Sequence, residues 1–280
     1  MGVIMGSVVK RMALGWLSAL LTIFPATAGS WMLSQGEVQY GGGITYYTDD
    51  SYWDQHSHLI SGTCTSHNLY LFQGLQYGYS YYHTLFVETT FALQRCGAVH
   101  TTGLGDVRLG IRGRLDVERN GRTWELAAIV PTGYSRTAPR RIGNGRLGVE
   151  GGLFFSGQEK GFEEKKRAFV KAGLKARYWF GPPASQLLGY LGGVWRVGSG
   201  QSLEGRINGD FSLRDGRPEP ISLTNQTQLS DHDRVYLEGK YNHVIMPAWT
   251  ATFSIGRDVW GRNSGRGTFA ALFLSHTWRP

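Results

Sequence analysis

Charged and apolar residues alternate one for one along much of the chain. The segment "GLGDVRLGIRGRLDVE", from Gly103 to Glu118, places its charges on one parity and its apolar residues on the other. The charged set comprises Asp106, Arg108, Arg112, Arg114, Asp116 and Glu118, and the apolar set Val107, Leu109, Ile111, Leu115 and Val117. A repeat of two residues predicts a β-strand with one charged and one apolar face. In a soluble β-sandwich the charged face of such a strand meets water, whereas in an outer-membrane barrel the apolar face meets lipid.

The same alternation returns in later segments of the chain. Their charged faces carry Glu125, Arg146, Glu150, Lys171, Lys175, Arg177, Glu204, Arg206, Asp210, Arg234, Glu238 and Lys240. Thirteen segments have the pattern of strands, namely 36–47, 66–77, 83–95, 104–117, 123–131, 146–157, 167–180, 186–197, 201–214, 219–230, 233–244, 248–258 and 267–278. Single-chain bacterial barrels have an even number of strands, so we expect twelve strands, with fourteen as the alternative.

The N-terminus has the pattern of a secretory signal peptide. Lys10 and Arg11 precede a short apolar run from Met12 to Phe24, and the small residues Ala26 and Ala28 follow it. A basic region, an apolar core and an A-x-A site predict cleavage after Ala28. The run is short for a transmembrane helix, and a buried core helix is the alternative. We therefore expect a signal peptide over residues 1–28 and a mature chain over residues 29–280.

Several features together favour the barrel over the sandwich. Charges of both signs occupy the polar face of strand after strand, and the strands are long enough to cross a bilayer obliquely. The chain contains 40 glycines, 14 tyrosines, 13 phenylalanines and 9 tryptophans, which suit the turns and aromatic girdles of a barrel better than helices. We predict an all-β protein, a single transmembrane antiparallel β-barrel in the outer membrane of a Gram-negative bacterium, with the charged faces lining its lumen.

The chain is basic, with a formal net charge of +8. Its positive residues alternate with apolar ones and mix with acids, apart from one cluster, "APRRIGNGR", in an expected loop. This distribution argues against nucleic acid as a partner. The partners expected instead are outer-membrane lipid and lipopolysaccharide, the barrel-assembly machinery, and a small-molecule solute.

A search for catalytic or metal-binding groups finds only weak candidates. Asp54, His56 and His58 in "DQHSH" could bind a metal, but a polar loop explains them better. The segment "SDHD", residues 230–233, could belong to a hydrolase, but a tight turn is the simpler interpretation. Ser275 and His276 are neighbours on an expected strand and face opposite ways. We predict no enzyme activity, no metal and no cofactor.

The two cysteines are expected to form a disulfide. A signal peptide implies an oxidising compartment, in which an even number of cysteines indicates pairing. Cys64 precedes one expected strand, Cys96 ends the next, and the two positions are symmetric about Ser80 in the intervening turn. In a single hairpin they would lie directly opposite each other, close enough for a disulfide at the extracellular rim. Two unpaired thiols in separate loops are the alternative.

Several motifs give the chain a resemblance to a known family. The segments "GLGDVRLGIRGRL", "ELAAIVPTGY" and "RIGNGRLGVEGGLFFSG" resemble the successive G-L-G-D, P-T-G and L-G-x-G segments of the MetA-pathway phenol-degradation family. The segment "LYLFQGLQYGYSYYHTLFVE" is similar to a tyrosine-glycine turn of that family. The resemblance covers about the central half of the chain. It implies an outer-membrane β-barrel that acts as a transporter, and it brings no catalytic residue.

These observations lead to a functional hypothesis with two alternatives. We expect an outer-membrane channel that passes small solutes through a mixed-charge lumen, and the resemblance implies aromatic or hydrophobic compounds as the solutes. The first alternative is a non-conducting barrel with a structural or surface-interaction role. The second is a membrane-embedded lipid-modifying enzyme or protease. A barrel of twelve strands lies between the filled eight-stranded barrels and the open porins, so strand number alone does not decide among them.

Overall fold

The computed structural model describes residues 32–115, 121–132, 142–143, 145–157, 168–181, 184–213 and 231–280. Within these ranges every regular element is a β-strand. The described part of the chain contains no helix long and apolar enough to cross a bilayer. The expected signal peptide and the expected strand 219–230 both lie outside the described residues.

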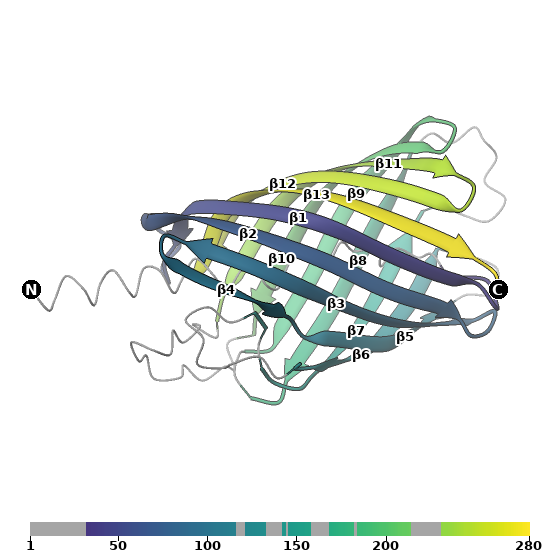
Figure 1. The fold of residues 1–280 in the computed structure, drawn as a ribbon, viewed down its shortest axis with the longest axis horizontal. Coiled ribbons are helices and arrows are strands. Elements are labelled where there is room, and N and C mark those ends of the chain that lie inside the picture. Colours follow the sequence, from purple (N-terminus) through teal and green to yellow (C-terminus); the bar gives the residue numbers. More distant parts are fainter. Residues whose placement is uncertain are drawn as a thin grey trace, which may run out of the picture.

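The strands form one antiparallel sheet that closes on itself (Figure 1). Their bounds are β1 (Val38–Trp53), β2 (Leu59–Gly78), β3 (His83–Cys96), β4 (Val99–Leu104), β5 (Val107–Arg114), β6 (Arg122–Val130), β7 (Gly148–Ser156), β8 (Ala168–Trp179), β9 (Gln186–Gly198), β10 (Gln201–Ser212), β11 (Asp233–Met246), β12 (Trp249–Arg262) and β13 (Ser264–Trp278). Because adjacent strands are also successive in sequence, the barrel has a simple up-and-down topology.

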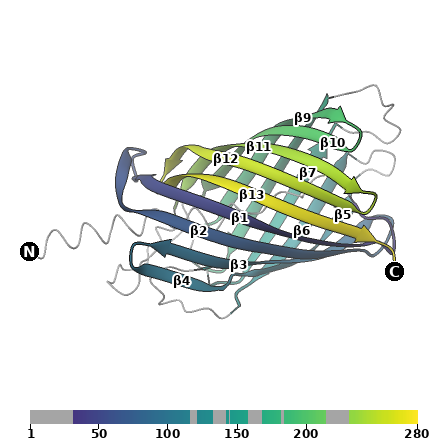
Figure 2. The ribbon, with the colours of Figure 1, turned by 45° about the horizontal axis from the view of Figure 1, so that its top comes forward.

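Closure of the barrel depends on β1 and β3. Strand β1 pairs with β2 on one side and with β13 on the other, and Figure 2 shows it lying between them. Strand β3 pairs with β2, with β4 along 91–96 and with β5 along 83–88. Strands β4 and β5 therefore follow each other along β3 and occupy one position in the barrel, interrupted at Gly105 and Asp106. The barrel thus has twelve strand positions, which confirms the predicted fold and the choice of twelve over fourteen.

The two ends of the barrel differ. The first residue of β1, Val38, pairs with the last residue of β13, Trp278. The start of the first strand and the end of the last strand therefore lie at the same rim. Turns of two residues connect β9 to β10 and β11 to β12 at this rim, whereas twenty residues separate β10 from β11 at the other. Outer-membrane barrels place their short turns in the periplasm. We therefore assign the rim that carries Val38 and Trp278 to the periplasmic side.

Aromatic side chains form a belt on the outer face near the periplasmic rim. The ring of His276 stacks between Trp249, at a centroid distance of 4.5 Å, and Trp278, at 5.2 Å. Tyr40 and Tyr77 are exposed on the adjacent strands β1 and β2. Amphipathic rings of this kind favour the boundary between lipid tails and headgroups. The belt therefore marks the periplasmic limit of the membrane-spanning surface.

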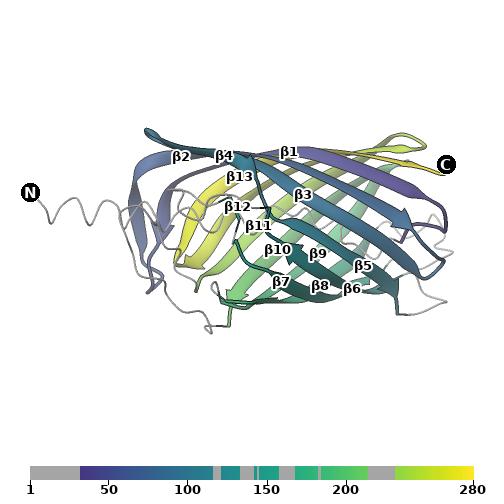
Figure 3. The same cartoon turned by 60° about the horizontal axis from the view of Figure 1, so that its bottom comes forward.

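The outer face of the wall is apolar and the inner face is polar. The exposed fractions of Leu109, Leu174 and Leu237 are 44%, 52% and 48%. Three positions after Leu109 along β5, Arg112 is 1% exposed. Figure 3 shows the curved wall that separates these two surfaces. The apolar face of the alternating strands therefore faces outward, toward lipid.

Glycines on the inner face make room for large neighbouring side chains. A Cβ atom at Gly43 would overlap the ring of Phe273, and one at Gly192 would lie 2.8 Å from Cγ of Arg206. Large side chains therefore cross over a glycine on the adjacent strand instead of projecting straight into the lumen. This arrangement lets a narrow barrel hold long charged and aromatic side chains along its wall.

Candidate functional site

The structure places the predicted lumen charges that lie on strands on the inner face of the barrel wall. Asp116, another residue of the predicted set, lies outside the described residues. The buried members are Arg108, Arg112, Glu125, Glu150, Arg177, Glu204, Arg206, Asp210, Arg234 and Lys240. The half-buried members are Asp106, Arg114, Arg146, Lys171, Lys175 and Glu238. Two of these lie off the strands, since Asp106 is at the interruption between β4 and β5, and Arg146 precedes β7.

A buried network of ion pairs crosses the inner face of β3 and of β5 to β8. The guanidinium of Arg108 donates to Glu88 at 2.7 Å and to Glu150 at 2.7 Å, and it also pairs with Glu125. Glu125 in turn accepts from Arg112 at 2.7 Å. Removing one member of a buried pair leaves an uncompensated charge, so these residues are strongly interdependent.

The same network extends onto β8 through Glu150. Lys175 Nζ lies 3.0 Å from a carboxylate oxygen of Glu150, and Arg177 Nη2 lies 2.6 Å from the other oxygen. Arg177 also donates to Gln186 of β9 at 3.3 Å. Every one of these charges therefore has an opposite charge within contact distance. The network holds adjacent strands together across the inner wall and fills that side of the lumen.

A second group of charges lies on β8, β10 and β11. Glu204 pairs with Lys171 at 3.3 Å and with Arg206 of its own strand. Lys240 lies 3.2 Å from Glu238. The guanidinium of Arg206 also stacks on the ring of Tyr190, 4.6 Å from its centroid. This group borders open space in the lumen, as do Glu88 and Arg112 of the first network.

That open space is a cavity of about 1290 Å³ at the periplasmic end, which we call the vestibule. Among the described residues, its charged lining consists of Glu88, Arg112, Lys171, Arg196, Glu204, Arg206 and Lys240, and its large apolar lining includes Phe72, Phe169, Val194 and Phe273. Met32 and Leu33, which precede β1, also border the vestibule. The backbone N–H of Leu33 donates to Thr84 Oγ1 at 3.3 Å, which fixes this segment against β3.

Described side chains fill part of the extracellular half of the lumen. Tyr47, Tyr70 and Ala92 form a buried cluster with Ile142, a residue of the long connection between β6 and β7. Phe269 packs against the same cluster from β13. The hydroxyl of Tyr47 donates to Asp258 at 2.8 Å, and Asp258 pairs with Arg234. An apolar side chain from a loop therefore sits inside the barrel and narrows it.

The segment "SDHD" contributes to this packing. His232 is fully buried, with its Nε2 3.3 Å from Asp210 and 3.3 Å from the side-chain nitrogen of Gln186. Asp233 accepts from the backbone N–H of Ser212 at 3.0 Å and from Arg262 at 2.7 Å. These contacts link the ends of β9, β10, β11 and β12. The segment therefore has a clear structural role at the extracellular end.

The "DQHSH" segment forms the tip of the hairpin between β1 and β2. One carboxylate oxygen of Asp54 accepts the backbone N–H groups of His56 and His58, both at 2.8 Å. The N–H of His58 and then that of His56 stabilise the charged form and lower the pKa of Asp54 below its usual value. Among the described residues, no group of three or more His, Cys, Asp or Glu side chains has an arrangement that could hold a metal ion.

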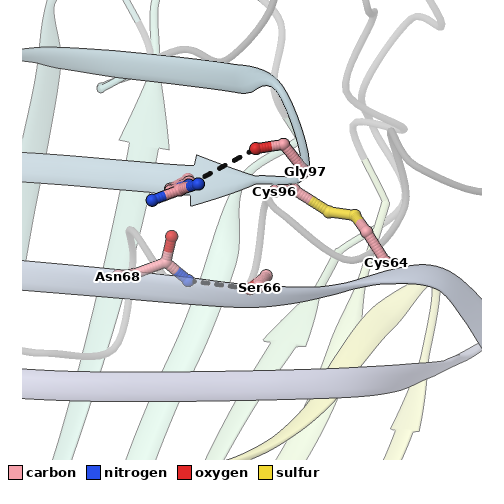
Figure 4. Close-up of a disulfide and its surroundings, with 6 residues drawn as sticks. Cys64, Ser66, Asn68, Cys96 and Gly97 are labelled. Atoms are coloured by element: carbon pink, nitrogen blue, oxygen red, sulfur yellow. Dashed lines mark hydrogen bonds between the residues drawn. A yellow bond between two sulfur atoms is a disulfide. The ribbon is translucent and has the colours of Figure 1, made fainter.

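A disulfide links Cys64 of β2 to Cys96 at the end of β3 (Figure 4). The two Cα atoms are 5.8 Å apart. The expected register is wrong by two residues, because Cys96 pairs with Ser66 and Tyr77 pairs with Leu85. The hairpin is therefore symmetric about Tyr81 instead of Ser80. The disulfide runs diagonally, joining the extracellular end of β3 to the part of β2 that extends beyond it.

Comparison with known proteins gives a fold but no family. No protein-family model matches the sequence, and no curated protein matches it either. Among solved structures, the COG4313 outer membrane channel from Pseudomonas putida F1 superposes with a TM-score of 0.72. The two sequences are 17% identical, and the match covers 88% of this chain and 97% of that one.

Two hydrocarbon channels match more weakly. The toluene transporter TodX of Pseudomonas putida matches with a TM-score of 0.46 at 10% identity, covering 96% of this chain and 97% of that one. The CymD monoaromatic hydrocarbon channel also has a TM-score of 0.46 at 10% identity, covering 92% of each chain. These two scores are too low to support an argument about this chain. The match to the COG4313 channel shows that the chain has the fold of a Gram-negative outer-membrane β-barrel.

Proposed function

We propose that this protein is an outer-membrane channel that passes small solutes. The observation that carries this proposal is the vestibule, a cavity of about 1290 Å³ enclosed by the closed barrel and bordered by both charged and apolar side chains. A filled barrel needs no such cavity, whereas a channel needs a water-accessible space with polar groups along its wall. The likeness in fold to a protein described as an outer membrane channel is consistent with this role.

The proposed solutes are small organic compounds with an apolar or aromatic body. Phe72, Phe169 and Phe273 border the vestibule and offer ring faces for such a body. The resemblance of the sequence motifs to the MetA-pathway phenol-degradation family supports the same class of solute. We propose no reaction in the vestibule, and we assign its polar side chains to binding and orienting the solute.

The outer face suggests how the barrel meets its lipid partners. Arg257 is exposed on the same face of β12 as Ile255 and Val259, and Arg95 is exposed near the extracellular end of β3. Exposed arginines among lipid-facing residues suit the phosphates of lipopolysaccharide. We propose that lipopolysaccharide contacts these positions and that the barrel-assembly machinery inserts the chain, as for other barrels of this type.

A second candidate function is a non-conducting barrel. The observation that favours it is the buried cluster of Tyr47, Tyr70, Ala92 and Ile142, which fills part of the extracellular half of the lumen. If this packing is permanent, the vestibule opens only toward the periplasm. The two candidates differ in one measurable property, the passage of ions across the whole barrel.

The test is the conductance of the purified protein in a planar bilayer. We expect discrete current steps above the bare bilayer, and their absence would favour the second candidate. The control uses a matched pair of tryptophan variants. Gly41 borders the vestibule with ordinary contacts around an added Cβ, whereas Gly239 is on the exposed outer face with nothing within 4 Å of an added Cβ. Gly41→Trp should lower the conductance, and Gly239→Trp should not.

A further inference from the structure

Among the described residues, the charges that border the vestibule are not balanced. Five of them are cationic and two are anionic, the cations being Arg112, Lys171, Arg196, Arg206 and Lys240 and the anions Glu88 and Glu204. Two further carboxylates, Glu125 and Glu238, lie behind this lining and reduce the excess, leaving five cations against four anions. Arg112 is paired with Glu125, and Lys240 with Glu238, but neither of these carboxylates borders the cavity. A solute in the vestibule therefore meets a surface with a net positive charge.

Arg196 is the cation best placed to meet a solute. It lies on β9, two residues before the strand ends at the periplasmic turn, and it is half-buried. Within the described part of the chain, no carboxylate oxygen lies within 4.0 Å of its guanidinium. Its described contact is with the ring of Phe169, whose centroid is 5.9 Å from the guanidinium carbon. Lys171 Nζ lies 5.7 Å from the centroid of the same ring.

This arrangement combines an aromatic surface with two cations. Phe169 provides the ring, and Arg196 and Lys171 each hold a positive charge over it, within 6 Å of its centroid. Arginine presents a planar set of donors that matches a carboxylate, and it keeps its charge at any physiological pH. Walls of low polarity strengthen the field of such charges inside a cleft.

We propose that the vestibule binds small organic anions with an aromatic or apolar body, and that the channel favours anions over cations. The inference deepens the proposed function, because it assigns a charge class to the solute and a place to its binding. The cationic lining attracts the anionic group, Arg196 orients it, and the rings of Phe169 and its neighbours pack against the body. A cation of the same size meets repulsion at the same positions.

Ion selectivity tests the charge part of the proposal. The zero-current potential across a bilayer with a tenfold KCl gradient gives the ratio of chloride to potassium permeability. We expect a ratio above one for the wild-type protein, a lower ratio for Arg196→Gln, and a ratio several-fold lower for Arg196→Glu. Arg122→Gln is the matched control, since Arg122 is an exposed arginine of the outer face at the periplasmic end of β6. A cation-selective wild type, or an unchanged ratio in Arg196→Glu, would overturn the proposal.

Ligand binding tests the solute class independently of conductance. Benzoate, benzyl alcohol and benzylammonium share one body and differ in charge, and calorimetry on the detergent-solubilised protein measures the affinity for each. We expect benzoate to bind most tightly and Arg196→Gln to weaken it by roughly tenfold, while affinity for benzyl alcohol stays within about twofold. Equal affinity for the three probes would overturn the proposal. Benzoate binding without any conductance would keep the binding site and overturn the channel function instead.

Discussion

Single side chains show how strictly this barrel separates lipid from lumen. Leu109 and Arg112 are three positions apart on β5, one exposed on the outer face and the other buried beside Glu125. Exchanging the two residues would destabilise the fold for two reasons. An arginine that faces lipid lacks partners for its charge, and a leucine in place of Arg112 leaves Glu125 less well paired. The alternation in the sequence therefore reflects two solvents on the two faces of one wall.

We predict that Leu109→Arg destabilises the folded barrel by about 2–4 kcal/mol, the cost of an arginine that faces lipid near the bilayer midplane. The free energy of unfolding in denaturant, measured in lipid vesicles, gives this value. Leu109→Val is the matched control and should change stability much less, because it keeps an apolar side chain in lipid. Equal stabilities for the two variants would mean that position 109 does not face the hydrocarbon.

Among the larger elements, the hairpin of β2 and β3 carries the disulfide. We predict that mass spectrometry of the non-reduced, protease-digested protein will find the peptides of Cys64 and Cys96 linked. A double variant, Cys64→Ser with Cys96→Ser, should still form the barrel, because continuous pairing from Ser66 to Gly78 holds β2 to β3 without it. The loop-entropy model gives at most roughly 3–4 kcal/mol for a loop of this length.

The effect of the double variant should be local to the extracellular end. Proteolysis should become faster within the part of β2 that pairs only with β1, residues 59–61, while the remainder of the barrel stays resistant. Free thiols in protein exported to the periplasm would contradict the pairing. A variant that fails to reach the membrane would contradict the view that the disulfide clamps the rim without being required for folding.

The connection between β6 and β7 supplies the apolar side chain that enters the lumen. We predict that Ile142→Ala raises single-channel conductance, because it shortens the side chain that packs against Tyr47 and Tyr70. Leu147→Ala, a change of similar size at an exposed position of the same connection, is the control and should leave conductance unchanged. An equal conductance for wild type and Ile142→Ala would show that the constriction lies elsewhere.

The elements differ in how far the sequence could predict them. For strands that carry charges on every second residue, the predicted bounds agree with the structure to within a few residues. Lipid on one face and a polar lumen on the other impose a two-residue repeat that a single sequence reveals. The predicted register of β2 and β3 is wrong by two residues. The sequence of a turn does not show which of its residues is the centre of the hairpin. Ile142 was missed because a single apolar residue in a polar loop has no periodicity. Arg196 was missed because "VWRVG" reads as an apolar strand end.

The molecule as a whole has different contents at its two ends. The periplasmic end holds an open, cationic vestibule, and the extracellular end holds buried aromatic residues and paired charges. No local pattern in the sequence distinguishes these ends, because both use inward-facing charged residues on the same strands. The difference arises from which side chains converge after the barrel closes. The sequence could therefore predict the lumen as a set of residues, but not the position of the cavity inside it.

The long hairpin of β1 and β2 has a consequence for recognition from outside the cell. Its strands are 16 and 20 residues long (Figure 2), and the carbonyl of Asp54 at its tip accepts the N–H of Asn263, in the turn between β12 and β13, at 3.0 Å. Gln55, His56 and His58 at this tip are exposed, so an antibody or a phage at the cell surface can contact them. An epitope inserted after Ser57 should therefore be detected on intact cells, whereas the same epitope after Pro280 should require permeabilised cells. Detection in the reverse order would mean that the barrel is inserted with the opposite orientation.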